Sequence, residues 1–480
     1  MEEKIDFREQ RIAKVEKLKE KGIEPYGRKF ERSAVIKDLI ENFEEGKSVK
    51  VAGRIMAIRS HGKSAFADVE DATGKIQFYV KKDAIGENNY EIFQLLDIGD
   101  FIGLEGTLFK TRMGEITIQA AGFTPLSKAL LPLPEKWHGL KDTEVRYRQR
   151  YLDLIANKSV REVLGKRSFI INKVRGFFNT RGFLEVETPV LQAIPGGAAG
   201  RPFKTHHNEF DCDLYLRIAP ELYLKKLLVG GFEKVYEMGK NFRNEGISTR
   251  HNPEFTMLEV YQAYADYNDM MDLIEELFVF LAKELFGTEE IEYQGKKISF
   301  KRPFKRISFA KALGLDPAEK DLKRWKEILK EKFDVDIEEG VSRSQIVRVA
   351  EDMLNPEGED SFQPAFIVDY FTELSPLAKT KKDNPALIER FELFTGGMEV
   401  ANAYSELNDP AEQKRRFIEQ EKEEKHEVKD EDFVRALEYG MPPAGGLGIG
   451  IDRLVMLFTN QSSIRDVVLF PQLKPVKEGE

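Results

Sequence analysis

The chain has 480 residues, long enough for two or three domains with sizeable cores, and its hydrophobic content of 41% is typical of a folded protein. A formal net charge of −9 argues against a general nucleic-acid binder, although a local basic face stays compatible with it. A single cysteine, Cys212, excludes an internal disulfide framework, and a charged N-terminus without long apolar runs leads us to expect a cytoplasmic protein without a secretory signal.

The first part of the chain predicts helices followed by a barrel. Residues 5–21 are amphipathic, with Ile5, Ile12, Val15 and Leu18 near one face. Gly22 and Pro25 are stop signals, and a second helix is expected over residues 34–43. From Val49 the period becomes that of strands, in the runs VKVAGRIMAIR, SAFADVED, GKIQFYV, DFIGLEGTLFK and EITIQAAGF. Five strands of this length indicate an OB-fold β-barrel, which we place in a domain of residues 1–124.

Two residues of this barrel are candidates for nucleic-acid contact. OB barrels bind single strands by stacking bases on exposed aromatic rings. Phe66 and Gln77 lie on adjacent predicted strands, where a ring would stack on a base and an amide would read a base edge. Packing in the barrel core is the alternative for Phe66.

A linker is predicted at residues 125–150. Two prolines, Pro132 and Pro134, stiffen it, and three arginines near its end make it basic, which suits a hinge with ion pairs or contact with a nucleic-acid backbone.

A second domain is predicted over residues 151–480. It begins with an amphipathic helix at about 159–181 and the strand GFLEVETPVLQ. The loop IPGGAAGRPFKTHH follows, and its Gly196 and Gly197 permit close approach of the backbone to a ligand. After a turn at Pro220, a helix begins at Glu221, for which helix capping is an adequate explanation.

The stretch from Val235 to Tyr264 predicts a long antiparallel hairpin. The period of two places Phe255, Met257, Glu259 and Tyr261 on one face of its second strand. The loop between the strands is crowded with Arg243, Glu245, Arg250 and His251. Guanidinium groups, a carboxylate, an imidazole and a nearby ring suit a nucleotide triphosphate, although charged loops are more often merely solvated.

The rest of the chain adds an acidic strand and a glycine-rich turn. Residues 298–360 predict a helical insertion. The run FELFTGGMEVANAYSELND carries several carboxylates, which are ligands suited to Mg²⁺; a pair of solvated acids is the alternative. In GGLGIGIDRLVMLF the glycines clear space over a flat ligand, and Arg453 would lie across an adenine face opposite Phe255; tight packing of strand and helix is the alternative.

These motifs resemble those of a known family. FRNE followed by RHNPEFTMLE is similar to the second signature motif of class II aminoacyl-tRNA synthetases, most closely the lysyl-tRNA synthetases of subclass IIb. The helix at 159–181 with its strand resembles the first motif, and GIGIDR resembles the third, in family order. The resemblance implies an α+β multidomain fold, an N-terminal OB-fold β-barrel before an antiparallel-sheet catalytic domain with a helical insertion, and a homodimer.

The resemblance also implies roles for individual residues, and hence tRNA(Lys), ATP, L-lysine and Mg²⁺ as partners. The predicted ATP site comprises Arg243, Glu245, Arg250, His251, Phe255, Glu392, Glu399 and Arg453, with Glu392 and Glu399 as metal ligands. The predicted lysine site comprises Gly197, Glu221, Arg243, Glu259, Tyr261, Asn402, Tyr404 and Glu406. The predicted anticodon contacts are Phe66, Gln77 and Glu115.

Within this site, Glu259, Glu406 and Tyr261 would hold the ε-ammonium, and Glu221 with the backbone near Gly197 the α-amino group. A substrate carboxylate is already a nucleophile, so adenylation needs no general base.

Arg243 and Arg453 would act in catalysis by positioning the reactants and stabilising charge. Three alternatives stay open: an aspartyl or asparaginyl enzyme, a paralogue that lysylates a protein, and a catalytically inactive nucleic-acid-binding protein.

Overall fold

A computed structural model of the chain describes residues 6–134, 140–198, 200–319, 321–338, 340–353, 362–424 and 430–475. Parts of the predicted linker and of the predicted insertion, residues 135–139, 320, 339 and 354–360, lie outside the described residues. The chain forms two compact units, Met1–Asp142 with Tyr151–Ala156, and Thr143–Arg150 with Asn157–Glu480. In the described ranges, no helix combines the length and the apolar character needed to cross a bilayer.

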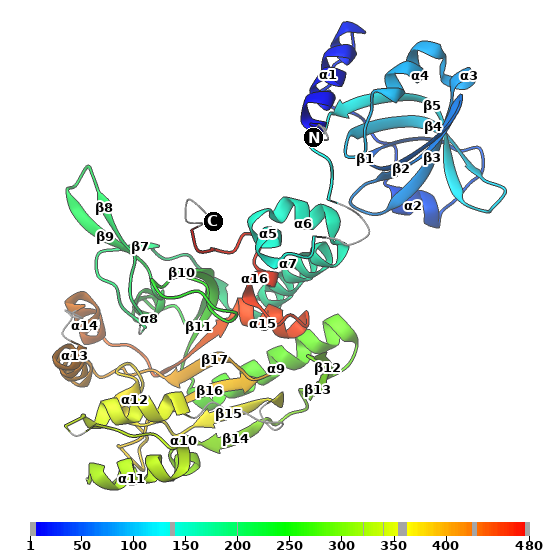
Figure 1. The fold of residues 1–480 in the computed structure, drawn as a ribbon. Coiled ribbons are helices and arrows are strands. Elements are labelled where there is room, and N and C mark those ends of the chain that lie inside the picture. Colours follow the sequence, from blue (N-terminus) through cyan, green and yellow to red (C-terminus); the bar gives the residue numbers. More distant parts are fainter. Residues whose placement is uncertain are drawn as a thin grey trace. The chain divides into compact units, whose positions relative to one another are not determined.

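The first unit is a closed five-stranded barrel with the strand order β1-β2-β3-β5-β4 (Figure 1). Its strands are β1 (Ser48–His61), β2 (Ser64–Glu70), β3 (Lys75–Lys81), β4 (Phe101–Lys110) and β5 (Ile116–Ser127). The described helices that accompany the barrel include α1 (Phe7–Glu20), α2 (Ile36–Glu41), α3 (Lys82–Ile85) and α4 (Glu87–Gln94). The predicted five-stranded OB-fold barrel is thereby confirmed.

Alternation along the strands sorts inner from outer side chains. Ala65, Ala67 and Val69 of β2 are buried in the barrel core. Phe66 and Gln77 belong to the opposite set, are only partly buried, and lie outside that core. The core alternative for Phe66 is therefore wrong.

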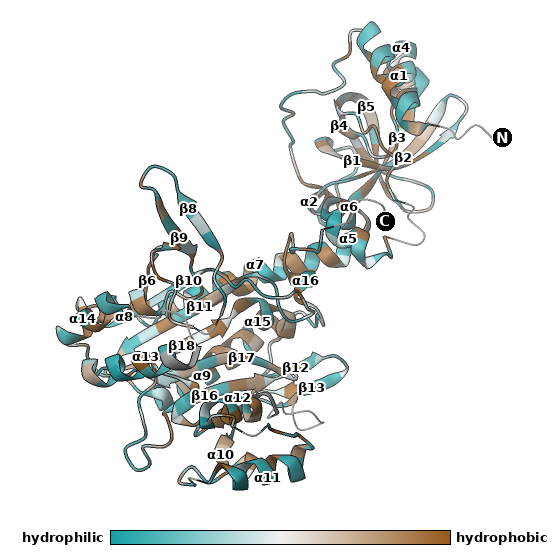
Figure 2. Ribbon diagram, turned by 60° about the vertical axis from the view of Figure 1, so that its left-hand side comes forward, coloured by the Kyte–Doolittle hydropathy of each residue, from teal (hydrophilic) through white to brown (hydrophobic). Residues whose placement is uncertain are grey.

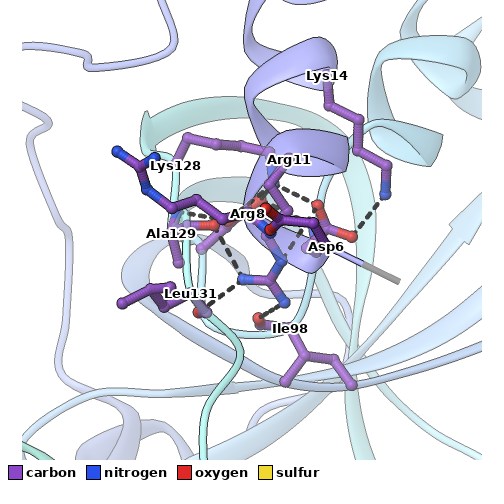
Figure 3. A network of polar contacts seen from close by, with 10 residues as sticks. Asp6, Arg8, Arg11, Lys14, Ile98, Lys128, Ala129 and Leu131 are labelled. Carbon is purple, nitrogen blue, oxygen red and sulfur yellow. Dashed lines mark hydrogen bonds and ion pairs between the residues drawn. The ribbon is translucent and has the colours of Figure 1, made fainter. Parts of the chain in front are cut away.

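Polar contacts attach α1 to the barrel unit (Figure 3). The Arg11 guanidinium donates hydrogen bonds to the backbone carbonyls of Ala129 and Leu131 at 2.9 Å each and of Ile98 at 3.1 Å. The sequence pattern placed Ile12 on the packed face of this helix, whereas Ile12 is exposed and Arg11 is buried. The prediction was wrong at this position because a long cationic side chain can be buried when its donors reach carbonyl groups.

The second unit is built on an eight-stranded sheet with the order β14-β15-β16-β17-β18-β11-β10-β6. Its strands are β6 (Leu184–Glu185), β10 (Lys234–Phe242), β11 (Glu254–Ala263), β14 (Lys305–Ser308), β15 (Ala365–Val368), β16 (Arg390–Thr395), β17 (Met398–Ser405) and β18 (Ala444–Gly450). All neighbours pair antiparallel except at the two edges, where β14 pairs with β15 and β6 with β10 in parallel. The predicted antiparallel catalytic sheet and the predicted hairpin (β10 and β11) are confirmed.

Helices cover both faces of this sheet. The larger apolar core lies between the sheet and α7 (Lys158–Asn179), α9 (Tyr267–Phe286) and α15 (Ile451–Phe458). A smaller core gathers residues of α8 (Glu221–Val229), α13 (Pro410–Glu424) and α14 (Glu431–Glu438) on residues of β10, β11 and β18. Figure 2 shows hydrophilic and hydrophobic residues mixed along β10 and β11, and a hydrophilic strand β8 (Lys204–His207). Strand β8 pairs with β9 (Cys212–Leu216), to which β7 (Leu191–Gln192) adds a third strand.

The predicted insertion is only partly helical. Its first residues form β13 (Lys296–Ser299), which pairs with β12 (Glu290–Tyr293), and then the edge strand β14. Helices follow as α10 (Phe309–Leu313), α11 (Leu322–Phe333) and α12 (Arg343–Met353). A four-residue edge strand carries too short an alternation to be separated from helix by its sequence pattern.

One arginine at the basic end of the predicted linker, Arg150, has a structural role. Residues around it form α5 (Thr143–Arg148) and α6 (Arg150–Ala156), and the chain ends its described part after α16 (Ile464–Val467). The Arg150 guanidinium is fully buried and donates to the carbonyls of Arg465 and Leu469 at 2.6 and 2.9 Å. Arg150 is therefore inaccessible to a nucleic-acid backbone.

Candidate active site

Strand alternation separates a polar face of β11 from the apolar core. Leu258 and Val260 point into the larger core, while Glu259 and Tyr261 are buried on the opposite face. Glu259 lies opposite Gly448 and Tyr261 opposite Gly446 of β18. The face that the period of two predicted is therefore real, and its carboxylate lies in a dry environment.

Three carboxylates meet on this face, and we call Glu221, Glu259 and Glu406 the acidic pocket. Glu221 is the first residue of α8 and accepts a hydrogen bond of 2.6 Å from the Tyr404 hydroxyl. Tyr261 donates to Glu259 at 3.3 Å. All three carboxylates are at most 6% exposed, so each has given up most of its hydration.

Glycines make the space that the acidic pocket needs. A Cβ atom on Gly446 would overlap Oε1 of Glu406 and lie 2.7 Å from the Tyr261 ring. Gly197 has a φ of +87°, and a Cβ there would lie 3.0 Å from the Glu221 side chain. The structure thus brings Gly197 beside Glu221, as the predicted lysine site requires.

The acidic pocket carries more negative charge than its protein partners relieve. Burial, followed by the charge of Glu221, raises the pKa of Glu259 to about 8. Burial also raises the pKa of Glu406, although the ammonium of Lys225 opposes the effect. Among the described residues, Oε1 of Glu406 has no hydrogen-bond partner. Such a site is suited to a cationic ligand, because a buried charge without partners is costly.

Arg243 and Phe255 form one side of the predicted nucleotide site. The Arg243 guanidinium carbon lies 5.2 Å from the centroid of the Phe255 ring, within the range of a cation–π contact. Its buried Nε has no hydrogen-bond partner in the part of the chain that the structure describes. Glu245 and Arg250 of the same loop are exposed, so this loop offers guanidinium donors to an anionic ligand.

Arg453 connects this loop with β17. Its guanidinium donates to the Glu399 carbonyl at 2.7 Å and lies 3.3 Å from the Glu399 carboxylate. The second terminal nitrogen lies 3.1 Å from Nε2 of His251. Partial desolvation and the Arg453 charge lower the pKa of His251, so this imidazole is neutral at pH 7.

Sequence reasoning did not find the residues that hold Arg453 in place. Asp452 forms an ion pair of 2.6 Å with Arg167 of α7 and accepts a hydrogen bond of 2.8 Å from the Thr256 backbone. These contacts fix the start of α15 on the sheet. The acid within GIGIDR was visible as a signal, but its partner lies more than 280 positions earlier in the chain.

The predicted metal ligands sit in a second acidic group. Glu392 is buried, pairs with Arg390, and accepts a hydrogen bond of 2.8 Å from the Tyr370 hydroxyl. Burial and the charge of nearby Glu399 raise the pKa of Glu392 despite Arg390. Asn402 lies here, with its side-chain amide 3.5 Å from the Glu392 carboxylate, and its place in the lysine site stays a prediction.

Hard carboxylate oxygens that repel one another fit a divalent cation. Among the described residues, no group of three or more His, Cys, Asp or Glu is arranged to hold a metal. A cation held by Glu392 and Glu399 would therefore take its other ligands from a bound phosphate or from water.

The outer face of the barrel presents the residues that sequence reasoning chose there. The Phe66 and Tyr79 rings lie with centroids 4.7 Å apart on β2 and β3. Gln77 accepts a hydrogen bond of 3.0 Å from the Thr117 hydroxyl, and Glu115 is exposed just before β5. Two partly exposed rings beside polar groups form a surface suited to stacking on bases.

Known proteins resemble this chain over nearly its whole length. The family described as tRNA synthetases class II (D, K and N) matches residues 142–474, and the family described as OB-fold nucleic acid binding domain matches residues 49–126. The lysine–tRNA ligase of Carboxydothermus hydrogenoformans is 56% identical, over 97% of both chains. That of Pelotomaculum thermopropionicum is 56% identical over 97% of this chain and 94% of its own. That of Thermotoga maritima is 49% identical over 99% of this chain and 97% of its own.

Proposed function

The chain belongs to the class II tRNA synthetases (D, K and N), and we propose that within this family it is a lysine–tRNA ligase. It activates L-lysine with ATP to form lysyl-adenylate and pyrophosphate, then transfers the lysyl group to tRNA(Lys) and releases AMP. This role in protein synthesis is exercised in the cytoplasm, and the motif carried by α7 supports a homodimer.

The acidic pocket is the observation that carries the choice of lysine. Glu259 and Glu406 are buried, and Oε1 of Glu406 has no partner among the described residues. An ammonium group would satisfy these acids, whereas an aspartate side chain would add another negative charge to them. Lys225, the cation beside the pocket, is already paired with Glu221 and Glu406, so it is not available to an acidic substrate.

The chain's own residues supply positioning and charge for adenylation. Arg243 would bind the lysine carboxylate and the α-phosphate, because its planar donors suit both groups. Arg453 and Phe255 would hold the adenine ring between them. The lysine carboxylate attacks the α-phosphorus and pyrophosphate leaves, with no proton to be removed by a general base.

Mg²⁺ fits the carboxylates of Glu392 and Glu399. When bound, it would neutralise charge on the phosphates of ATP. The loop between β10 and β11 carries Glu245, Arg250 and His251, which would contact the nucleotide.

The barrel supports recognition of tRNA. Phe66 would stack on an anticodon base, and Gln77 and Glu115 would contact base edges. A protein-lysylating paralogue resembles the catalytic domain alone, so the barrel argues against that alternative. Arg453 is paired, and the Arg243 Nε has no partner among the residues that the structure describes. Both observations argue against an inactive binding protein.

Amino-acid-dependent exchange of pyrophosphate into ATP tests the proposal. Lysine should support exchange, while aspartate and asparagine should not; exchange with aspartate in place of lysine would reject the assignment. Glu406→Gln should raise the KM for lysine and leave the KM for ATP unchanged. The matched control is Glu254→Gln on the same hairpin, an exposed residue whose partner Lys240 lies 3.5 Å away, and it should behave as the unaltered chain does.

A further inference from the structure

Lys225 is a buried cation to which neither the sequence motifs nor the reaction assigns a role. Its side chain is fully buried on α8. The ammonium lies 2.6 Å from Oε1 of Glu221 and also contacts Oε2 of Glu406. It thus bridges two of the three carboxylates of the acidic pocket, which come from segments about 180 positions apart in the sequence.

Lys225 reaches these carboxylates without filling the pocket. Its ammonium lies 5.5 and 5.9 Å from the ring centroids of Tyr404 and Phe433, and Phe433 belongs to the small apolar core beneath α8. Oε1 of Glu406 is left without a partner among the described residues. The ion pairs therefore orient two carboxylates and leave the third, Glu259, to a ligand.

The net charge of the acidic pocket balances the two ammonium groups of L-lysine when Lys225 is counted with the pocket. Three carboxylates and one ammonium give the ionised pocket a net charge of two negative charges. L-lysine brings two ammonium groups, and its carboxylate would face Arg243. Without Lys225 the pocket would hold three buried acids against two ligand cations, which leaves one buried charge without a partner.

We infer that Lys225 is a positioning residue for lysine recognition: it fixes Glu221 and Glu406 and sets the net charge of the acidic pocket to match the two ammonium groups of the amino acid. The inference rests on the proposed function. Lys225 acts through the two carboxylates and touches no reacting atom.

Pyrophosphate exchange in three variants tests the inference. Lys225→Met keeps an unbranched side chain of nearly the same length and removes the charge, so the KM for lysine should rise on the order of 30-fold or more. The KM for ATP should stay within about twofold, and kcat at saturating lysine within about threefold, because the groups around ATP are untouched. Lys226→Met is the matched control: Lys226 is the next residue of the same helix, and its ion pair with Asp432, at 2.7 Å, lies outside the pocket.

Lys225→Arg separates charge from packing. Arginine keeps the cation but is larger than the site, so a purely structural role predicts greater damage from Arg than from Met. Positioning by charge predicts the opposite order, with the KM for lysine closer to normal in Lys225→Arg.

An unchanged KM for lysine in folded Lys225→Met, a greater rise in Lys225→Arg than in Lys225→Met, or loss of the fold in both variants would each overturn the inference. These outcomes differ from a failure of the proposed function, in which the unaltered chain and Lys226→Met would show no lysine-dependent exchange at all.

Discussion

Lysine binding should release a proton from Glu259. Burial and the neighbouring Glu221 charge raise the pKa of Glu259 from 4.5 to about 8, so this carboxyl is mostly protonated in the lysine-free protein at neutral pH. An ammonium group placed beside it favours the ionised form. The affinity for lysine should therefore increase as the pH rises towards 8.

The pKa sets the size of the effect. Roughly 1% of Glu259 is ionised at pH 6 and roughly 10% at pH 7. If lysine binds the ionised form, the apparent Kd falls about tenfold between these two values, because the competent fraction scales the affinity. The stability of the lysine-free protein changes in the opposite sense: a raised pKa contributes stability that is complete below pH 4.5 and is lost as the pH rises through 8.

Titration calorimetry without ATP measures both the affinity and the proton. Two buffers that differ in protonation enthalpy should reveal roughly one proton released per lysine bound at pH 6.5. Glu259→Gln is the control, since it should bind lysine weakly and without this pH dependence. A Kd for lysine that changes less than about twofold between pH 6 and pH 7 in the unaltered chain would refute the reasoning.

Three further outcomes are expected. Phe66→Ala should remove a stacking contact worth ~1–3 kcal/mol, which weakens tRNA charging while pyrophosphate exchange persists. Its control, Phe78→Ala in the barrel core, should lower the stability of that domain by about 3–5 kcal/mol. Equal destabilisation of both variants in thermal unfolding would contradict this prediction. Gly446→Ala should raise the KM for lysine and spare the KM for ATP in exchange assays, because the added methyl group meets Glu406. Arg167→Met should destabilise the chain by about 3–5 kcal/mol in urea unfolding, since Asp452 loses its buried cation; a change below about 1 kcal/mol would count against that ion pair.

Local sequence patterns were sufficient to predict most of the fold correctly. The alternation along β11 identified the face that holds Glu259 and Tyr261, because strand geometry alone sends alternate side chains to opposite faces. The same rule separated Phe66 from the barrel core only once the pairing of β2 and β3 was known. Ile12 was misplaced because hydropathy does not register that Arg11 can satisfy its donors on carbonyl groups from distant loops.

Partners far apart in the chain limited the prediction of the site. Motif order suggested the acids of the pocket, and the spacing of Glu221 and Lys225 is that of an ordinary helical ion pair. That Lys225 also reaches Glu406 depends on how α8 packs on the sheet, which no local pattern records. Asn402 was assigned to the lysine site by its place in a motif; its side chain lies beside Glu392 in the structure, and its contact with lysine stays a prediction.

The acidic pocket destabilises the free protein and selects its ligand through the same electrostatic interactions. Burial and mutual repulsion raise the pKa values of Glu259 and Glu406, which means that their ionised forms are held in the fold at an unfavourable free energy. A ligand regains that free energy only if it brings ammonium groups to the carboxylates. An amino acid of the same size with an uncharged side chain brings no ammonium group to Glu259 and Glu406, and one with an acidic side chain adds to the repulsion. Selectivity should therefore weaken in any variant that lowers these pKa values, even where the shape of the pocket is unchanged.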